Sequence, residues 1–216
     1  INEDSVGIIE KGSQICCVLC DGLGGHGRGE EASQYVVHEL LECFETSDEP
    51  IEHMADAFEQ AQTGLLEEQK KKSAKFEMKT TATMLIANDK YVRWGHIGDS
   101  RVYLFKKGKY KKRTLDHSVP QMLVLAKDIK EKEIRNHPDR NKLLRVMGIE
   151  WGASSYEISK KIRRRQGMAF LLCSDGFWEL IEEKQMQETL KASSNASEWI
   201  KAMVEIVKQN GKDKNM

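Results

Sequence analysis

The segment QICCVLCDGLGGHGRGEEAS, residues 14–33, combines an apolar run, a single carboxylate and a glycine-rich stretch. The apolar run at residues 15–20 is short and bounded by polar residues, which predicts a buried strand. Asp21 follows directly, and five of the next eight residues are glycines. Glu30 and Glu31 then open a helical pattern, where negative charge suits the positive end of the helix dipole. The segment therefore predicts a carboxylate at a strand end, beside backbone that a ligand can approach closely.

Three interpretations of the glycine-rich stretch are open from this segment alone. Residues 22–27 fit the pattern G-x-G-x-x-G between a strand and a helix, which is the context of a dinucleotide-binding loop. Alternatively, Asp21 ligates a hard cation, and the small residues let backbone carbonyls and waters reach that cation. The third interpretation is a tight strand-to-helix turn that binds nothing. The rest of the chain has to decide among them.

Length and composition indicate one globular domain of 216 residues, of which 39% are apolar and 31% are charged. The 34 basic and 34 acidic residues give a net charge of zero, so the global charge does not point to nucleic acid or to a membrane. No apolar run approaches the roughly 20 residues of a membrane span, and the sequence shows no secretory signal. Because the chain begins at Ile1 rather than at a methionine, we expect a fragment or a processed product.

The five cysteines are expected to be reduced residues of the core, which favours a cytoplasmic protein. Four of them lie in apolar, strand-like runs: Cys16, Cys17, Cys20 and Cys173. No C-x-x-C pair is matched by a second such pair, which argues against a zinc site.

The first third of the chain predicts a hairpin followed by two helices. A Lys-Gly turn joins a short apolar patch at residues 6–9 to the strand at residues 15–20. Apolar residues at helical spacing then predict helices over residues 30–44 and 51–65. The charged link at residues 69–75 is predicted to be a solvated loop.

The remainder of the chain is rich in β-forming residues. Strands are expected at residues 80–86, 91–97, 101–105 and 110–115, and the short turns between them predict one antiparallel meander. A dinucleotide-binding loop needs a βαβ unit in a parallel sheet, so this pattern counts against that interpretation. Further on, strands at residues 156–162 and 168–173, joined by a basic turn, predict another hairpin with a solvated tip.

Two further carboxylates stand at turns or strand ends. Asp99, in the sequence Gly-Asp-Ser-Arg, lies between two predicted strands, where a plain turn that uses Asp and Ser is the alternative interpretation. Ser174-Asp175-Gly176 repeats the arrangement at Asp21, because an apolar strand again ends in Asp followed by Gly.

Six short motifs, taken together, resemble the metal-dependent PPM/PP2C family of protein serine/threonine phosphatases in its bacterial form. They are Asn2-Glu3-Asp4, Asp21-Gly22-Leu23-Gly24-Gly25-His26, Thr80-Thr81-Ala82-Thr83, Gly95-His96-Ile97-Gly98-Asp99-Ser100-Arg101, Asp116-His117-Ser118 and Ser174-Asp175-Gly176. One such motif alone is a weak signal. Six motifs in the family's order, spread over nearly the whole chain, are a strong one.

The resemblance implies an α+β fold of four layers, α-β-β-α, in which a central antiparallel β-sandwich is flanked by helices. It implies a single domain over residues 1–216, in which residues 126–140 form a flap-like insertion beside the active site. The family has an arginine before its first motif and an Asp-Asn pair near its end. Those positions would precede Ile1 and follow Met216, so we expect a domain truncated at both ends.

The resemblance also implies two bound Mn²⁺ or Mg²⁺ ions, and a third, weaker ion in bacterial members. The implied ligands are oxygen donors: Asp21, which bridges the two ions, the carbonyl of Gly22, Asp175, Glu3, Asp4 and, for the third ion, Asp99. Thr81 would contact these ligands and would not bind an ion itself. Two such ions can lower the pKa of a bridging water and neutralise phosphate charge, and they prefer oxygen ligands of this kind.

The implied function is the hydrolysis of phosphoserine and phosphothreonine in proteins by a metal-activated water, with Asp21, Asp175 and His26 as the catalytic residues. Animal members carry a histidine directly after the Asp-Gly pair, where this chain has Leu23, so His26 and metal-bound water are both candidates for protonating the leaving alkoxide. The alternative function is a non-catalytic regulatory module that keeps the fold and binds phosphoproteins. Expected partners are phosphoproteins and a serine/threonine kinase that modifies them, and the protein is expected to be a monomer.

Overall fold

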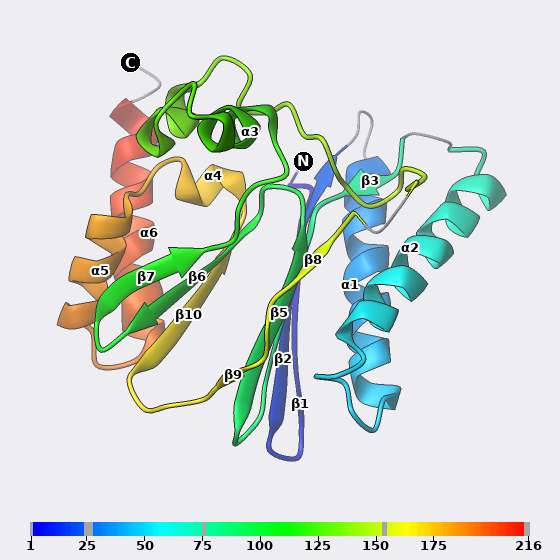
Figure 1. The fold of residues 1–216 in the computed structure, drawn as a ribbon, viewed down its shortest axis with the longest axis horizontal. Coiled ribbons are helices and arrows are strands. Elements are labelled where there is room, and N and C mark those ends of the chain that lie inside the picture. Colours follow the sequence, from blue (N-terminus) through cyan, green and yellow to red (C-terminus); the bar gives the residue numbers. More distant parts are fainter. Residues whose placement is uncertain (1, 24–27, 75–76, 153–154, 214–216) are drawn as a thin grey trace. The chain divides into compact units, whose positions relative to one another are not determined.

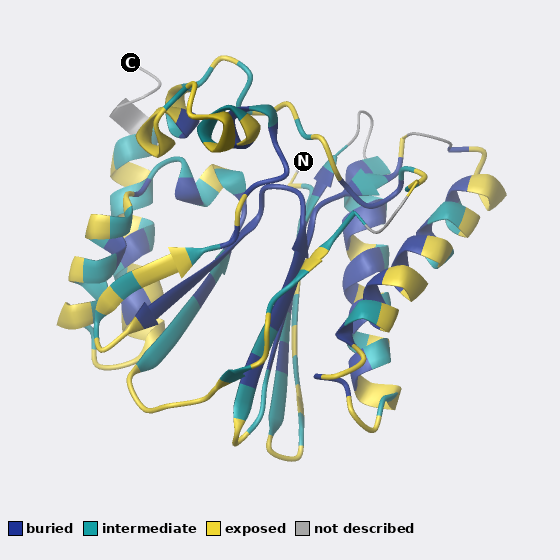
Figure 2. Ribbon diagram, in the orientation of Figure 1, coloured by how far each residue is buried: buried dark blue, intermediate teal, exposed yellow. Residues whose placement is uncertain are grey.

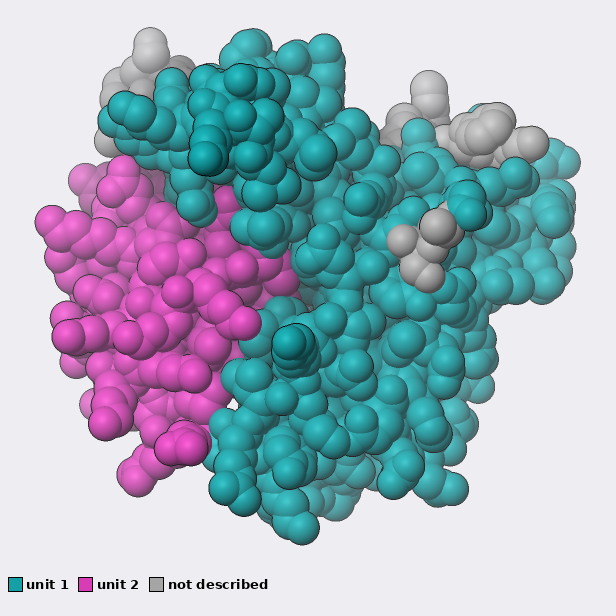
Figure 3. All heavy atoms as spheres, viewed as in Figure 1, with its two compact units in different colours: residues 1–100, 115–164 teal, residues 101–114, 165–216 magenta. Residues whose placement is uncertain are grey.

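The computed structural model describes residues 2–23, 28–74, 77–152 and 155–213 (Figure 1). The chain divides into two compact units, which Figure 3 shows in different colours. The larger unit comprises residues 1–100 and 115–164, and the smaller unit comprises residues 101–114 and 165–216. Each unit contains its own antiparallel sheet and its own helices.

The sheet of the larger unit has the strand order β1-β2-β4-β5-β8, with β3 paired to β2 and β9 paired to β5. Its strands are β1 (Asp4–Lys11), β2 (Gln14–Leu23), β3 (Lys79–Thr80), β4 (Ala82–Ala87), β5 (Tyr91–Ile97), β8 (Glu157–Ile158) and β9 (Ile162–Arg163). The predicted first hairpin is confirmed, with Lys11 opposite Gln14 at the turn and Asp4 opposite Asp21 at the open end. Strand β4 is buried along nearly its whole length. Strand β1 instead alternates between exposed and half-buried residues (Figure 2).

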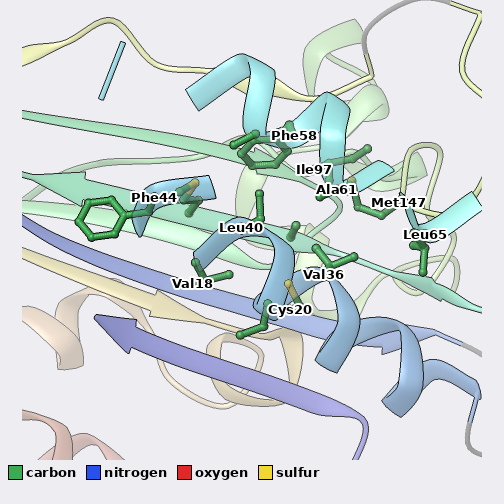
Figure 4. Packing of buried hydrophobic residues seen from close by; sticks show 14 of the residues in the cluster. Val18, Cys20, Val36, Leu40, Phe44, Phe58, Ala61, Leu65, Ile97 and Met147 are labelled. Atoms are coloured by element: carbon green, nitrogen blue, oxygen red, sulfur yellow. The ribbon is translucent and has the colours of Figure 1, made fainter. Parts of the chain in front are cut away.

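Helices α1 (Arg28–Thr46) and α2 (Met54–Lys71) pack with this sheet, and the apolar side chains of the helices and the sheet form the core of the larger unit. In Figure 4 the labelled core side chains come from β2, α1, α2 and β5: Val18, Cys20, Val36, Leu40, Phe44, Phe58, Ala61, Leu65 and Ile97, together with Met147. Burial of each large apolar side chain in this core contributes roughly 1.5–3 kcal/mol. The core therefore holds β2, and with it Asp21, in a fixed place.

The predicted loop at residues 69–75 is partly wrong, because α2 continues to Lys71 and buries Gln69. The Gln69 side-chain amide donates hydrogen bonds of 2.7 Å to the carbonyls of Met78 and Gly148. Because both of its hydrogen-bond acceptors are present, the Gln69 amide can be buried without loss of stability. The charged residues around Gln69 in the sequence did not indicate this burial.

Residues 126–140, which were expected to form a flap, begin at the last residue of a short helix and contain a 3₁₀ helix and turns. Helix α3 (Val119–Ala126) starts after Ser118 and ends at Lys127, which has a left-handed φ of 67°. The 3₁₀ helix η2 (Glu131–Asn136) follows, and its Ile134 is buried while its neighbours are exposed or half-buried. Among the described helices, none is long and apolar enough to cross a membrane.

The smaller unit has a three-stranded sheet in the order β10-β6-β7: β10 (Met168–Cys173), β6 (Arg101–Lys106) and β7 (Lys109–Arg113). Its helices are α4 (Asp175–Trp178), α5 (Glu183–Ala192) and α6 (Ala196–Asp213). Phe105 of β6 packs edge-on against Trp199 of α6 with ring centroids 5.2 Å apart, and the Trp199 indole donates to the Met186 carbonyl. These contacts join α5 and α6 to the sheet.

Two predicted strand connections are wrong. The meander breaks at residues 98–100, because β5 belongs to the sheet of the larger unit and β6 to that of the smaller unit. The predicted hairpin of residues 156–162 and 168–173 does not form either. Strands β8 and β9 pair with β5, whereas β10 pairs with β6. Apolar alternation identifies strands but does not say which sheet a strand joins. The α+β class with antiparallel sheets is confirmed.

Candidate metal centre

Asp21 lies near the end of β2, and the backbone at this residue is bonded on both sides. The N–H of Asp21 donates to the hydroxyl of Thr81 at 2.9 Å. Its carbonyl accepts from the N–H of Thr81 at 2.8 Å and from the hydroxyl of Thr80 at 2.9 Å. Both threonines are fully buried. Three hydrogen bonds therefore fix the position from which the Asp21 carboxylate projects.

Gly22 packs directly against the start of helix α1. A Cβ atom at Gly22 would lie 2.2 Å from the carbonyl oxygen of Gly29, and one at Gly29 would lie 2.8 Å from the backbone of Gly22. Because the neighbouring atoms are backbone and cannot move aside, both positions require glycine. Two of the five glycines counted in the sequence therefore serve close packing of strand and helix.

The first motif runs beside this strand end. Asp4 of β1 is the direct register partner of Asp21. The carbonyl of Glu3 accepts from the N–H of Gly22 at 3.1 Å and from the hydroxyl of Ser33 at 2.6 Å. These bonds bring the Glu3 backbone to Gly22, so three of the predicted acidic ligands meet at one end of the first hairpin.

The carboxylates of Asp4 and Asp21 affect the pKa of the neighbouring Cys20 thiol. Burial raises the pKa of Cys20, and the carboxylates of Asp21 and Asp4 raise it further. Like charges placed directly opposite each other on adjacent strands are destabilising. The Asp4–Asp21 pair is thus a place where a bound cation would be favourable, and where a thiolate would not form.

Asp99 lies on a turn that is connected to the same strand end. It is buried, and its neighbour Ser100 shares a hydrogen bond of 2.7 Å with the hydroxyl of Thr81. The same Thr81 hydroxyl accepts from Asp21. Gly98 has a left-handed φ of 98°, and a Cβ there would lie 2.6 Å from the Thr81 side chain. Thr81 therefore connects the turn that carries Asp99 to the strand that carries Asp21.

His117 fixes the other side of this turn. Its Nδ1 accepts from the N–H of Gly98 at 3.2 Å, and its own backbone N–H donates to the Gly98 carbonyl at 2.9 Å. Its ring stacks on that of His96, with centroids 4.7 Å apart. Burial, and then the nearby His96, lower the pKa of His117 to about 4, against the opposing effect of the Glu157 carboxylate.

His96, His117 and Glu157 also bring one ligand atom each to within 4.8 Å of one another. The hydrogen bond from Gly98 requires a lone pair on Nδ1 of His117, so the ring proton is assigned to Nε2. That nitrogen faces Glu157 at 3.4 Å, and no hydrogen bond to it is found in the described chain. A metal on Nε2 would need the opposite tautomer, so we interpret this pair as support for the Gly98 turn.

Asp175 lies in the smaller unit, in a different local setting. It is the first residue of α4, and Ser174, in the N-cap position, separates it from the end of β10. Its carbonyl accepts from the N–H of Glu179 at 2.9 Å. The prediction of an Asp-Gly pair after a strand is correct here, although Asp175 begins a helix whereas Asp21 still belongs to a strand.

The residues of the first hairpin fit a hard divalent cation, because the available donors are carboxylate and carbonyl oxygens. His26 lies outside the described residues, so its position remains a prediction. The cysteines fit the prediction that they are reduced: none of the five forms a disulfide, Cys16, Cys20 and Cys173 are buried, and Cys17 and Cys43 are half-buried. Burial raises the pKa of the Cys16 and Cys17 thiols, which makes them poor nucleophiles.

Sequence reasoning missed the contacts that four supporting residues make: Ser33, Gly29, Ser100 and His117. The last two were inside recognised motifs, but their roles depend on contacts between distant segments. Ser33 gave a weaker signal, since a serine in the first turns of a helix is common and its bond to Glu3 spans 30 residues.

Comparisons with known proteins give one consistent result. The family profile described as protein phosphatase 2C matches residues 1–216. The serine/threonine phosphatase Stp of Listeria monocytogenes serotype 4b is 30% identical over 217 residues, which cover 97% of this chain and 84% of that protein.

Solved structures agree. The serine/threonine phosphatase Stp1 from Staphylococcus aureus superposes with a TM-score of 0.87 at 27% identity, covering 98% of this chain and 85% of that chain. The catalytic domain of the serine/threonine protein phosphatase PstP, in complex with two manganese ions, superposes with a TM-score of 0.82 at 25% identity, covering 98% and 86%.

Proposed function

Because the chain belongs to the protein phosphatase 2C family, we propose that its own carboxylates hold the divalent ions on which this family of serine/threonine phosphatases depends. The chain is a metal-dependent protein phosphatase that acts on phosphoserine and phosphothreonine. The proposed ligands are Asp21, the Gly22 carbonyl, Glu3, Asp4, Asp175 and, for a third ion, Asp99.

The observation that carries the proposal is the direct pairing of Asp4 with Asp21 at the open end of the first hairpin. Two carboxylates in register on adjacent strands repel each other unless a cation lies between them. The hydrogen bonds that the Asp21 backbone forms with Thr80 and Thr81 already hold it in place without a cation. Such a preformed site loses little conformational entropy on binding.

Hydrolysis of the phosphoester adds a water oxygen to phosphorus and breaks the bond from phosphorus to the serine or threonine oxygen. When bound, the divalent ions lower the pKa of water and neutralise the charge of the phosphoryl group. The residues of this chain hold the ligand oxygens in place and supply a proton to the departing alkoxide. We assign that proton to His26, on the ground that it follows Asp21 by five residues in the glycine-rich part of the sequence.

The proposal extends to the substrates, the oligomeric state and the location of the protein. The substrates are phosphoproteins that a serine/threonine kinase has modified. The protein works as a monomer. It works in the cytoplasm, which is supported by the absence of disulfides among its five cysteines, all of which are described.

The competing functions have less support. A non-catalytic binding module has no need for the carboxylates of Asp4, Asp21 and Asp175, all of which are present. A dinucleotide-binding protein would need a parallel sheet, whereas the strands of the described residues pair only in antiparallel fashion.

The test is phosphate release from a phosphothreonine peptide, with Mn²⁺ and with a chelator. Wild-type protein is expected to release phosphate only with Mn²⁺. Asp21→Asn is expected to lower kcat by about a thousandfold or more, because metal ions supply several kcal/mol of transition-state stabilisation. Asp56→Asn, on helix α2, is the matched control and should retain activity. Equal activity of Asp21→Asn and wild type would refute the assignment.

A further inference from the structure

Basic residues are concentrated in the smaller unit. Its sequence contains 14 basic and eight acidic residues, whereas the larger unit contains 20 basic and 26 acidic residues. The two units therefore carry net charges of +6 and −6, although the whole chain is neutral. Residues 106–113, with the sequence KKGKYKKR, contribute six of the 14 basic residues of the smaller unit.

Two tight turns fix the backbone that carries these cations. Lys107 and Gly108 both have positive φ, 50° and 67°, as a two-residue type I′ hairpin turn requires. The N–H of Lys107 donates to the carbonyl of Gly167 at 2.7 Å, which bonds this turn to the one that precedes β10. The ladder shifts register between Leu104 and Phe105, so β7 has a bulge within its run of lysines.

Side chains from both turns line a pocket of about 390 Å³. The lining residues are Lys106, Lys107, Lys109, Lys111, Arg165, Gln166 and Met168. Five of these seven are basic and none is acidic. Within the described part of the chain, none of the five forms an ion pair, whereas exposed lysines elsewhere do, such as Lys71 with Glu68. The pocket thus gathers positive charge without internal compensation.

We propose that this pocket docks an acidic segment of the phosphoprotein substrate. The proposal rests on the phosphatase function, because phosphoproteins are then the macromolecules that the enzyme must bind. A concave pocket with aliphatic lysine stems and Met168 suits individual carboxylate side chains of a peptide better than a flat membrane surface. Its lining residues include no aromatic ring for stacking nucleic-acid bases.

The test is fluorescence anisotropy of a labelled glutamate-rich peptide without phosphate, titrated with the full chain in the absence of added metal. A peptide with glutamine in place of glutamate is the ligand control. The variant Lys107→Glu/Lys109→Glu should weaken binding of the acidic peptide by about tenfold, since it replaces two attractions by two repulsions. Lys184→Glu/Lys201→Glu changes the net charge equally, at exposed positions of α5 and α6, and should stay within about twofold of wild type.

Equal weakening in both double variants would overturn the proposal, because the effect would then reflect net charge alone. Binding of anionic phospholipid vesicles or of single-stranded oligothymidine, without binding of the acidic peptide, would also overturn it. A second readout is catalytic: the pocket variant should raise KM for an acidic phosphopeptide and leave kcat unchanged. If no phosphopeptide were hydrolysed, the phosphatase assignment would fail, while the anisotropy would still report on the pocket.

Discussion

The two Asp-Gly pairs look alike in the sequence and differ in the structure. At Asp21 and Gly22 the chain is still in β2, and the glycine touches the backbone of α1 so closely that no side chain fits. At Asp175 and Gly176 the chain has already entered α4, and a Cβ on this glycine would meet nothing within 4 Å.

The hydrogen bonds differ in the same way. The Asp21 backbone is held by two buried threonines from another strand region, whereas the Asp175 carbonyl accepts from Glu179 within its own helical turn. The first pair is therefore positioned by tertiary contacts and the second by local structure. We infer that Asp21 is the less tolerant of the two to changes in its surroundings.

The largest difference in stability is expected from alanine at the two glycines. Gly22→Ala would place a methyl group 2.2 Å from a backbone oxygen, which should lower the free energy of unfolding by about 3 kcal/mol or more. Gly176→Ala adds a methyl group in open space at the start of a helix and should change stability by less than about 1 kcal/mol. Urea denaturation of both variants checks this, and similar midpoints would contradict the comparison.

A smaller effect is expected from the threonine that supports Asp21. Thr81→Val removes the acceptor of the Asp21 N–H and should lower Mn²⁺ affinity by about tenfold or more, as loss of a supporting residue does at metal sites. Thr83→Val is the matched control, because Thr83 is equally buried and donates instead to the carbonyl of Leu19. Calorimetric titration should find Mn²⁺ affinity of the control within about twofold of wild type. An equal loss in both variants would assign the effect to general destabilisation.

The pH dependence of the free energy of unfolding tests whether His117 is held neutral in the folded protein. Its pKa is lowered to about 4 in the folded protein, against about 6.5 in the unfolded chain, so the unfolded chain binds more protons between these values. Stability should therefore fall as pH decreases from about 6.5 to 4, by at most about 3 kcal/mol from this residue. His117→Asn keeps an acceptor near Gly98 and cannot titrate, so its denaturation midpoint should depend less on pH over that interval. An unchanged slope would contradict this assignment.

The smallest perturbation is a measurement without mutation. We expect amides in residues 126–140 to exchange with solvent at least about a hundredfold faster than those of β5, because most of this stretch is exposed and β5 is central in its sheet. Hydrogen exchange followed by mass spectrometry resolves the two segments. Equal protection would mean that residues 126–140 are as rigid as the core and do not form a mobile flap.

Much of the fold could be predicted from the sequence because local patterns carry it. The first hairpin and the helices α1 and α2 follow from apolar spacing and turn residues, and the structure confirms them. The break between β5 and β6 could not be predicted in this way. It depends on which sheet each strand joins, and residues 98–100 look like an ordinary hairpin turn.

The candidate site follows the same division. Asp21, Asp99 and Asp175 were predicted as carboxylates at strand ends or turns, and the structure places each at such a position. The bonds of Ser33 to Glu3 and of Ser100 to Thr81 link segments 30 and 19 residues apart, so no local pattern could reveal them.

The most direct test of the account is the number of Mn²⁺ ions bound, measured by isothermal titration calorimetry on the wild type, Asp21→Asn and Asp175→Asn. If Asp21 bridges two ions and Asp175 binds one of them, the wild type should bind two ions tightly, apart from the weaker third ion at Asp99. Asp175→Asn should bind about one ion tightly, and Asp21→Asn none with measurable affinity. Unchanged stoichiometry in Asp21→Asn, with the protein folded, would contradict the claim that this strand end is the core of the metal centre.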